Sequence, residues 1–379
     1  MKRLGVLISF SGDGGVERMV TNLCAEFARH VQVDLLAIKG GGGHASRIPK
    51  SVNLINLKAR HSWTSVREIA DYLREAQPDA MLVAKDRAGR AALRAKAKAG
   101  VQTPIYIRLG TNLSAALERK DAFSRWLRVA PMRRLYPRAA GVIAVSEGVR
   151  QDTIAITRLP PERVQVIRNP VITATLEAQA AEPVSHPWLS DRVLPVVMGM
   201  GRLTTQKDFP TLIRAFAQLQ DSQPSRLILL GDGKDREALQ QLAADLGVAQ
   251  RLHFAGFQKN PYAWLARADL FVLSSAWEGS PNALTEALAL GIPSVATDCP
   301  SGPVEILDGG RYGPLVTVGD ASGMAAAMRQ ALTDPLPADT LRAAVAEYRA
   351  DISAKRYLDR LLGGTVEVPP SADPPSLAT

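Results

Sequence analysis

Apolar and polar positions in the N-terminal part of the chain alternate between two patterns. Short runs rich in branched apolar residues are typical of buried strands, and they occur at 3–10, 31–38, 52–57, 79–84, 105–109 and 141–146. Glycines follow the first run, and after them Met19, Leu23 and Phe27 recur at helical spacing. A second helix is expected at 64–76. Strands that alternate with helices predict a parallel sheet covered on both faces.

The alternation stops at 173–192, which contain Pro183 and Pro187 and show little periodicity. Beyond this segment it begins again, with strands at 194–203, 226–233, 251–257, 269–275 and 292–298 and helices at about 208–220, 234–246, 260–267 and 282–290. We therefore expect an α/β protein with two doubly wound, Rossmann-like domains. Open parallel sheets bind ligands at the carboxyl ends of their strands, so the two domains are expected to face each other across a cleft.

The chain of 379 residues is too long for one typical core and suits two domains. The first is expected at 1–172 and the second at 193–350, with 173–192 as the linker. A terminal helix at 351–363 is expected to pack back on the first domain. The final segment, 364–379, is rich in Pro, Ser and Ala and is predicted to be disordered.

Composition narrows the class of protein. Hydrophobic residues make up 46% and charged residues 22%, as in soluble globular proteins. No signal peptide is recognisable, and no apolar run reaches the roughly 18 residues that a spanning helix needs. Cys24 and Cys299 fit neither a metal spacing nor a disulfide framework. Two reduced thiols in a cytoplasmic protein are the expected reading.

The net charge of +9 is concentrated in one segment. Residues 85–138 hold 14 Lys and Arg against three acids, a balance of +11, so the rest of the chain sums to −2. Such a patch predicts an anionic partner or, as the alternative, a solvated surface. Bulky apolar residues beside arginine, as at 126–128 and 132–136, favour docking on an anionic membrane surface. Nucleic acid is disfavoured because no aromatic platform or binding motif is visible.

The first chemical motif follows the strand at 194–203. Gly201 provides a turn, Arg202 comes next, and Lys207 stands five residues further on. A guanidinium grips phosphate with two hydrogen bonds and an ammonium adds a point charge. The helix expected from about 208 would add free N–H groups to an anion site. A surface turn with two solvated cations is the alternative.

The second motif surrounds a turn with two acids. Glu278 lies in a loop after a strand, Glu286 lies in the next helix, and seven residues intervene. The turn folds one carboxylate towards the other, and carboxylates accept hydrogen bonds from sugar hydroxyls. One acid near a helix start is explained by the helix dipole, but two acids around Ser280-Pro281-Asn282 are not. A third motif, 298–305, fixes a turn beyond the last strand, where Gly302 would leave backbone amides open to a ligand.

In this order the motifs resemble the C-terminal half of retaining family 4 glycosyltransferases of the GT-B fold. The resemblance covers 196–310 closely, and a weaker one at 5–28 and 141–170 extends it to most of the chain. Many members have Phe-Gly after the first Glu-Gly, where this chain has Ser280-Pro281. That version resembles bacterial members that build surface polysaccharides.

The resemblance implies a role for each motif. Arg202 and Lys207 would hold the diphosphate of a nucleotide-sugar donor, Glu286 its ribose, and Glu278 the transferred sugar. The backbone of the glycine turn and of the second motif would contact the donor, at Gly201, Ser280, Pro281, Asn282, Ala283 and Leu284. Gly14 and Gly15 resemble the N-terminal glycine loop of the family, close to donor phosphate and acceptor. No histidine base is identified at 107–112, where many members carry one.

The implied reaction moves a hexosyl or N-acetylhexosaminyl group, with retention, from a nucleoside-diphosphate sugar. UDP is expected because it is frequent in the family. The acceptor would be a lipid-linked or envelope glycan, and the enzyme would be cytoplasmic and peripheral at the inner membrane. No cofactor and no essential metal are expected, because the two cations would neutralise the diphosphate. A GT-B-fold nucleotide-sugar epimerase and a non-catalytic nucleotide-sugar-binding protein remain as alternatives.

Overall fold

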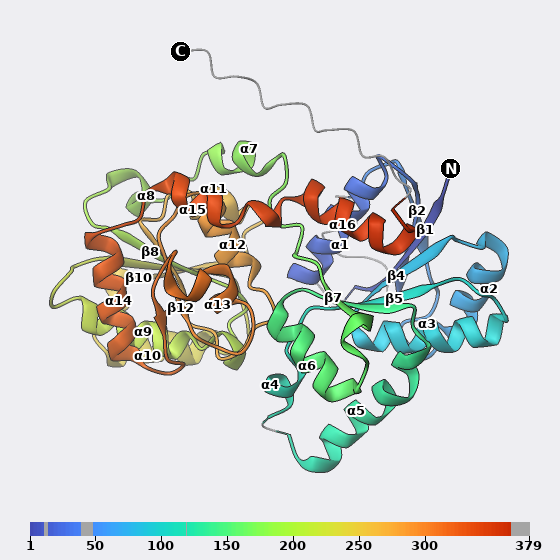
Figure 1. Ribbon diagram of the computed structural model, residues 1–379. Helices are drawn as coiled ribbons and strands as arrows, with labels where there is room; N and C mark the ends of the chain where they lie inside the picture. The colour runs from blue at the N-terminus through green and yellow to red at the C-terminus, as the bar shows by residue number, and fades with distance from the viewer. Residues whose placement is uncertain (11–13, 39–47, 119, 365–379) are drawn as a thin grey trace, which may run out of the picture.

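The computed structural model describes residues 1–10, 14–38, 48–118 and 120–364. These residues form two parallel sheets, each covered by helices (Figure 1). The first sheet has the order β3-β2-β1-β4-β5-β6-β7, and every neighbouring pair is parallel. Its strands are β1 (Arg3–Ser9), β2 (Gln32–Ile38), β3 (Val52–Asn56), β4 (Ala80–Ala84), β5 (Ile105–Leu109), β6 (Gly141–Ala144) and β7 (Val164–Val166).

Helices cover both faces of this first sheet. They are α1 (Gly15–Phe27), α2 (Val66–Ala76), α3 (Asp86–Ala99), α4 (Leu113–Leu117), α5 (Ala122–Leu135), α6 (Glu147–Thr157) and, from the end of the chain, α16 (Ala350–Leu362). Leu4, Val6 and Ile8 of β1 pack with α1 and α16, while Leu7 packs with the helices of the opposite face. Because successive side chains of a strand point to opposite faces, a strand covered on both sides reads as one unbroken apolar run.

The second sheet has the order β10-β9-β8-β11-β12-β13 and is also entirely parallel. Its strands are β8 (Val196–Met200), β9 (Arg226–Leu230), β10 (Leu252–Gly256), β11 (Leu270–Leu273), β12 (Ser294–Thr297) and β13 (Leu315–Val316). Its helices are α9 (Phe209–Leu219), α10 (Arg236–Asp245), α11 (Pro261–Leu265), α12 (Asn282–Ala289), α13 (Pro303–Ile306), α14 (Ala321–Thr333) and α15 (Ala338–Ala344). Helices α9, α10 and α14 share the core on one face of this sheet, and α11, α12 and α15 share the core on the other face.

The segment 173–192 is more ordered than its weak pattern predicted. It contains α7 (Leu176–Ala181), which packs on α11, and α8 (Pro187–Asp191). A helix of five or six residues completes fewer than two turns, so no periodicity can show in the sequence. The sheets themselves end at Val166 and begin again at Val196. The domain limits at 172 and 193 stay predictions within that interval.

The terminal helix α16 crosses back to the first domain (Figure 1). Its Tyr357 is fully buried and meets the ring of Phe27 on α1 edge-on, with the ring centroids 6.2 Å apart. The predicted tail lies outside the described residues from 365 onwards. Short 3-10 turns lie between the other elements: η2 (Tyr136–Arg138), η3 (Pro161–Arg163), η4 (Thr205–Lys207), η5 (Ala249–Arg251), η6 (Asp308–Gly310) and η7 (Ala346–Tyr348).

The strand order of each sheet reverses direction once. In the first sheet the reversal lies between β1 and β4, and in the second it lies between β8 and β11. Ligands of open parallel sheets bind outside the carboxyl ends of the strands at such a point. Loops from the carboxyl ends of both sheets meet one another: the hydroxyl of Ser146, after β6, donates to the carbonyl of Gly279, after β11. The two crevices of the fold therefore open towards the same junction.

Candidate functional site

Lys207 and Glu278 meet at the reversal point of the second sheet. Lys207 ends the short turn η4 after β8, and Glu278 lies in the loop after β11. The Lys207 Nζ atom is 2.5 Å from Glu278 Oε1, and the Ser275 hydroxyl donates to the same oxygen at 2.7 Å. A Cβ atom at Gly201 would lie 2.9 Å from Lys207 Cε, so glycine there leaves room for the lysine stem. The first two predicted motifs are thus in direct contact.

Arg202 stands differently from Lys207, although the two were predicted to act together. Its side chain is exposed on the turn after β8. Within the described part of the chain it forms no ion pair and no side-chain hydrogen bond. One of the predicted phosphate cations is therefore already paired with a carboxylate, while the other has no partner among the described residues.

The N-terminus of α12 offers two free amides. The N–H groups of Leu284 and Thr285 donate to the carbonyl oxygen of Pro281, at 3.2 and 3.3 Å. Those of Asn282 and Ala283 have no acceptor among the described residues, so they are the ones available to an anion. The Leu284 side chain is fully buried in the core. Leu284 thus packs in the core, and its N–H group, which was expected to contact the donor, already donates to Pro281.

Glu286 lies in the second turn of α12 and is fully buried. Its Oε1 atom accepts a hydrogen bond from the guanidinium of Arg18 in the first domain. Its Oε2 atom has no hydrogen-bond partner within the described residues. Burial raises the pKa of Glu286, and Arg18 and Lys207 partly offset that rise by favouring the charged form. The Arg18 contact was missed in the sequence, although Arg18 stands beside the predicted glycine loop.

The glycine loop also approaches the second domain. Gly14 caps α1 and Gly15 begins it, and a Cβ atom at Gly15 would lie 3.2 Å from the side-chain nitrogen of Asn282. The amide of Asn169 donates to Asn282 Oδ1 at 2.8 Å. Arg108, which is fully buried at the end of β5, donates in turn to Asn169 at 2.5 Å. Residues 11–13 of the loop lie outside the described part.

A second set of contacts joins the domains through Glu305. Its carboxylate accepts hydrogen bonds from the N–H groups of Glu147 and Gly148 at the start of α6, at 2.8 and 2.9 Å, and pairs with Arg168 at 2.5 Å. An acid at a helix N-terminus is stabilised by the free N–H groups there. Glu305 belongs to the third motif of the sequence, where no role was predicted for it. Gly302 has a φ of +94°, and a Cβ atom there would lie 2.6 Å from Pro281 Cδ, so glycine is required by both the backbone and the packing. The open amides expected around Gly302 stay a prediction.

The reversal point of the first sheet carries its own ion pair. Lys85 follows β4 and donates to Glu17 Oε1 at 2.7 Å and to the carbonyl of Ser9 at 2.9 Å. Its φ of +74° lies in the left-handed region, which non-glycine residues rarely adopt. Glu17, like Arg18, belongs to the first turn of α1. Neither residue of this pair was singled out in the sequence, where only their positions after a strand and after the glycines could have indicated them.

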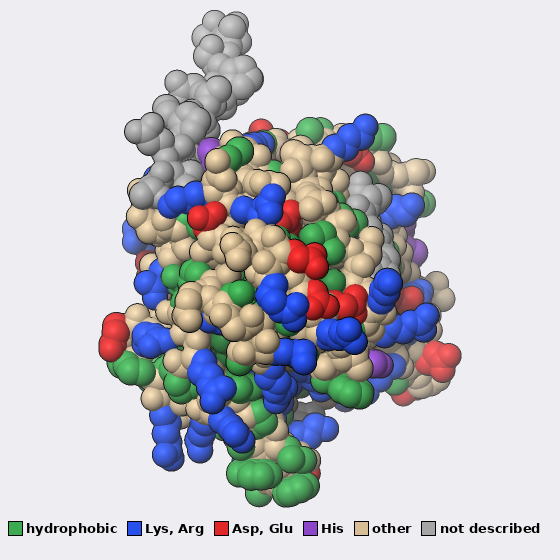
Figure 2. All heavy atoms as spheres, turned by 90° about the vertical axis from the view of Figure 1, so that its right-hand side faces the viewer, with side chains coloured by type: hydrophobic (Ala, Val, Ile, Leu, Met, Phe, Trp, Pro, Cys, Tyr) green, Lys and Arg blue, Asp and Glu red, His purple; other side chains and the backbone are tan. Residues whose placement is uncertain are grey.

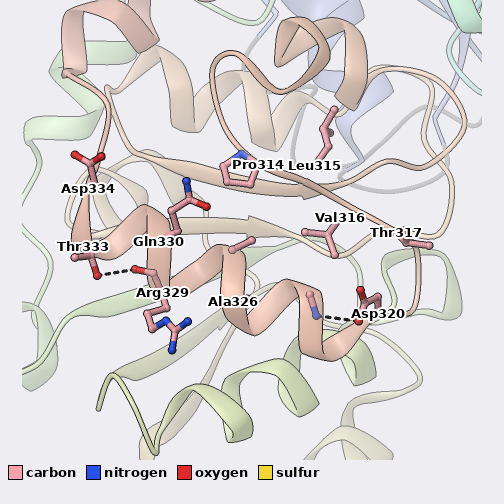
Figure 3. Close-up of a pocket in the computed structure, with 12 residues that line it drawn as sticks. Pro314, Leu315, Val316, Thr317, Asp320, Ala326, Arg329, Gln330, Thr333 and Asp334 are labelled. Atoms are coloured by element: carbon pink, nitrogen blue, oxygen red, sulfur yellow. Dashed lines mark hydrogen bonds between the residues drawn. The ribbon is translucent and has the colours of Figure 1, made fainter.

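One open hollow of the surface lies away from these residues. An open depression of about 860 Å³ is bounded by β13 and α14, and Asp320, Arg329 and Asp334 are among its lining residues (Figure 3). It contains no residue of the predicted donor site. Within the described ranges, no three His, Cys, Asp or Glu side chains gather as metal ligands would. Cys24 and Cys299 are buried and unpaired, and burial raises the pKa of each thiol to about 12.

Two families match consecutive parts of the chain. Residues 13–175 match the family described as Glycosyltransferase Family 4, and residues 194–334 match the family described as Glycosyl transferases group 1. A solved structure of Anabaena HepE in complex with UDP and glucose has a TM-score of 0.70 at 20% identity, covering 95% of this chain and 96% of that one. This likeness confirms the predicted GT-B fold.

Two relatives differ in how much of their length is matched. The lipopolysaccharide core biosynthesis glycosyltransferase LpsE of Rhizobium meliloti (strain 1021) is 43% identical over 153 residues, which cover 40% of this chain and 43% of the relative. The N-acetylgalactosamine-N,N'-diacetylbacillosaminyl-diphospho-undecaprenol 4-alpha-N-acetylgalactosaminyltransferase of Campylobacter jejuni is 26% identical over 368 residues, covering 94% of this chain and 96% of the relative. With both of its halves matched in this way, the protein belongs to glycosyltransferase family 4.

Proposed function

We propose that the protein transfers a hexosyl or N-acetylhexosaminyl group from a UDP-sugar to a lipid-linked or envelope glycan, with retention of configuration. The observation that carries this proposal is the convergence of Lys207, Glu278 and Glu286 with the open amides of α12 at one reversal point. Such a set of cations, carboxylates and helix N–H groups matches the parts of a nucleotide sugar. The diphosphate is anionic, whereas the ribose and the transferred sugar present hydroxyl donors.

Departure of the nucleoside diphosphate develops negative charge on the leaving oxygen. Lys207, Arg202 and the N–H groups of Asn282 and Ala283 would stabilise that charge, because fixed donors aimed at a developing anion lower the barrier. Lys207 is held by Glu278 in the free protein. On donor binding, Glu278 would exchange the lysine for hydroxyls of the transferred sugar, which leaves the ammonium to the phosphate.

Retention is proposed by same-face attack of the acceptor hydroxyl, as the family resemblance implies. The departing phosphate would help to take the proton of the acceptor hydroxyl. This route needs no protein base, which agrees with the lack of a histidine at 107–112. A covalent route would need a carboxylate nucleophile of the kind used by retaining glycosidases. Glu278 and Glu286 are here engaged by Lys207 and Arg18 instead.

A panel of nucleotide sugars tests the donor class. The melting temperature of the protein should rise with UDP-sugars and not with GDP- or ADP-sugars, because a ligand that binds only the folded state stabilises it. The name of the HepE structure, which includes UDP and glucose, supports this choice of base. Any sugar that shifts the melting temperature is then incubated with a lipid-linked glycan acceptor, and the anomeric configuration of the product is read by NMR. An inverted product would contradict retention, and a product formed without acceptor would favour the epimerase alternative.

Turnover is expected to survive removal of divalent metal. The cations near the diphosphate site, Lys207 and Arg202, would supply the charge that a metal otherwise provides. The transfer rate is measured before and after dialysis against EDTA, with magnesium added back as the control. A rate that falls on dialysis and returns with magnesium would contradict the prediction.

The acceptor is proposed to be reached at an anionic membrane surface, at the cytoplasmic face of the inner membrane. Three bulky side chains of α5 point into solvent: Phe123, Trp126 and Leu127 are 66%, 61% and 52% exposed. A hollow of about 620 Å³ beside them is lined by Arg125, Trp126, Val129, Ala130, Arg133 and Arg134. In Figure 2 hydrophobic side chains gather at the lowest part of this face, with Lys and Arg side chains above them. Apolar side chains rimmed by cations suit shallow insertion among anionic lipids.

Vesicle flotation tests the membrane proposal. The protein should float with vesicles that contain phosphatidylglycerol and stay behind with pure phosphatidylcholine. Replacing Phe123 and Trp126 by serine should reduce flotation about 10-fold or more, because both side chains lose the apolar surface that would enter the bilayer. The exposed Trp63, which is 74% exposed on the same domain, gives the matched control variant Trp63→Ser. Equal binding to neutral vesicles would contradict the proposal. No helix in the described part of the chain is long and apolar enough to cross a membrane.

A further inference from the structure

Arg18 belongs to the first domain but ends inside the candidate donor site of the second. It lies in the first turn of α1, and its guanidinium donates to Glu286, which is 268 residues further along the chain. The guanidinium carbon lies 5.5 Å from the centroid of the Tyr262 ring on α11, the range of a cation–π contact. Gly15, the first residue of α1, carries no Cβ, which at that position would lie 3.2 Å from the side-chain nitrogen of Asn282 on α12. Arg18 is thus held between two helices of the other domain.

The ion pair of Arg18 and Glu286 is largely shielded from water. The Arg18 side chain is 17% exposed and that of Glu286 is 0% exposed. A carboxylate removed from water needs a counter-charge, and Arg18 is the largest influence that favours the charged form of Glu286. Surface pairs contribute little because water screens both partners, whereas here one partner has no contact with water. Arg18 therefore supplies the main counter-charge that offsets the burial of Glu286.

Part of this buried pair is left without partners. Glu286 Oε2 and Arg18 Nε are both buried and have no hydrogen-bond partner among the described residues. Buried polar atoms are nearly always paired, so two unpaired atoms in one contact indicate that this contact is suited to binding a polar ligand. The carboxylate oxygen Oε2 can accept a hydrogen bond, and the guanidinium Nε–H can donate one. A ligand with hydroxyl donors beside anionic oxygens would satisfy both, and a nucleoside diphosphate has this composition.

We infer that Arg18 is a donor-site residue supplied by the first domain, which binds the nucleoside diphosphate together with Glu286. The inference rests on the proposed function, since it assumes that the ligand is a nucleotide. In the free protein the guanidinium is held by Glu286. When ribose hydroxyls donate to the carboxylate, Arg18 is left beside the diphosphate, to which a guanidinium binds strongly. Donor affinity then depends on contact between the domains, because this cation comes from one domain and Lys207 from the other.

The test compares Arg18, in the first turn of α1, with an arginine just beyond the end of the same helix. Arg29 follows the end of α1 and also pairs with a glutamate, Glu26, at 2.7 Å, but its side chain is 61% exposed. The dissociation constant of UDP is measured by titration calorimetry on the full chain for wild type, Arg18→Ala, Arg18→Lys and Arg29→Ala. We expect Arg18→Ala to weaken UDP binding about 10-fold or more, since one charge-assisted contact to phosphate is lost. The dissociation constant of Arg18→Lys should lie between those of wild type and Arg18→Ala, and that of Arg29→Ala should equal the wild-type value.

Melting curves of the same variants distinguish a binding role from a purely structural one. An interdomain strut would lower the melting temperature of Arg18→Ala and leave the UDP affinity of the folded protein unchanged, which would overturn the inference. If Arg18→Ala does not fold, Arg18→Lys keeps the charge and carries the same comparison, and wild-type affinity in that variant would overturn it equally. Failure of the wild-type protein to bind any nucleoside diphosphate would instead contradict the proposed function.

Discussion

Replacing Lys207 by alanine is expected to lower kcat about 10²–10³-fold, the cost of removing one fixed donor from a developing anion. In the free protein the lysine is bound to Glu278, and its stem fills the space that Gly201 leaves. The variant therefore loses a phosphate cation and also leaves a carboxylate that is 8% exposed without its counter-charge. A lower melting temperature should accompany the lower kcat. Initial rates with a UDP-sugar and thermal melts measure the two effects.

Arg202→Ala provides the informative contrast to Lys207→Ala. Because Arg202 is exposed and has no side-chain partner among the described residues, its loss should lower kcat without changing the melting temperature. Lys234→Ala is the control, since Lys234 is exposed in a loop of the same domain and is not part of the candidate site. Near-normal kcat in Lys207→Ala would remove the lysine from the diphosphate site. A fall in kcat of equal size in Lys234→Ala would show that the effect comes from net charge alone.

Most strands were predictable because the central ones are buried on both faces, whereas β7 and β13, of three and two residues, were not predicted. β5 was predicted at 105–109 and is observed as Ile105–Leu109, and the other predicted strands differ by a few residues at their ends. The helices of the basic segment 85–138 were not predicted. In α3 the buried positions are mostly small, such as Ala88, Ala91 and Ala95, so no stripe of large apolar residues marks the face that packs on the sheet.

The candidate site was predictable where its parts are neighbours in the chain. Gly201, Arg202 and Lys207 lie within seven consecutive residues of one loop, so the motif alone indicated that they belong to one place in the structure. Arg18 and Glu286 are 268 residues apart, and Glu305 and Glu147 are 158 apart. Sequence spacing carries no information about such pairs, because they form only when the two sheets turn their carboxyl ends towards each other. The contacts that join the domains were therefore the part that only the structure revealed.

Replacing Glu286 by glutamine is expected to abolish measurable donor binding and to destabilise the protein by about 3 kcal/mol, the cost of leaving one member of a buried ion pair alone. Glutamine has nearly the volume of glutamate, so the packing of α12 is preserved and the change is mainly one of charge. Arg18, partly buried beside Tyr262, then has no counter-ion in this contact. Ribose hydroxyls would also meet one acceptor in place of two. Chemical denaturation and UDP titration calorimetry measure the two effects.

A double variant separates the two consequences of the buried charge. Arg18→Met together with Glu286→Gln removes both charges, so no unpaired ion remains and much of the lost stability should return. UDP binding should not return, because the hydroxyl acceptor and the phosphate cation are both gone. If the double variant stayed as unstable as Glu286→Gln alone, the instability would come from packing around α12 rather than from Arg18. If it bound UDP as the wild-type protein does, neither residue would belong to the donor site, and the site would have to rest on Lys207, Arg202 and the amides of Asn282 and Ala283 alone.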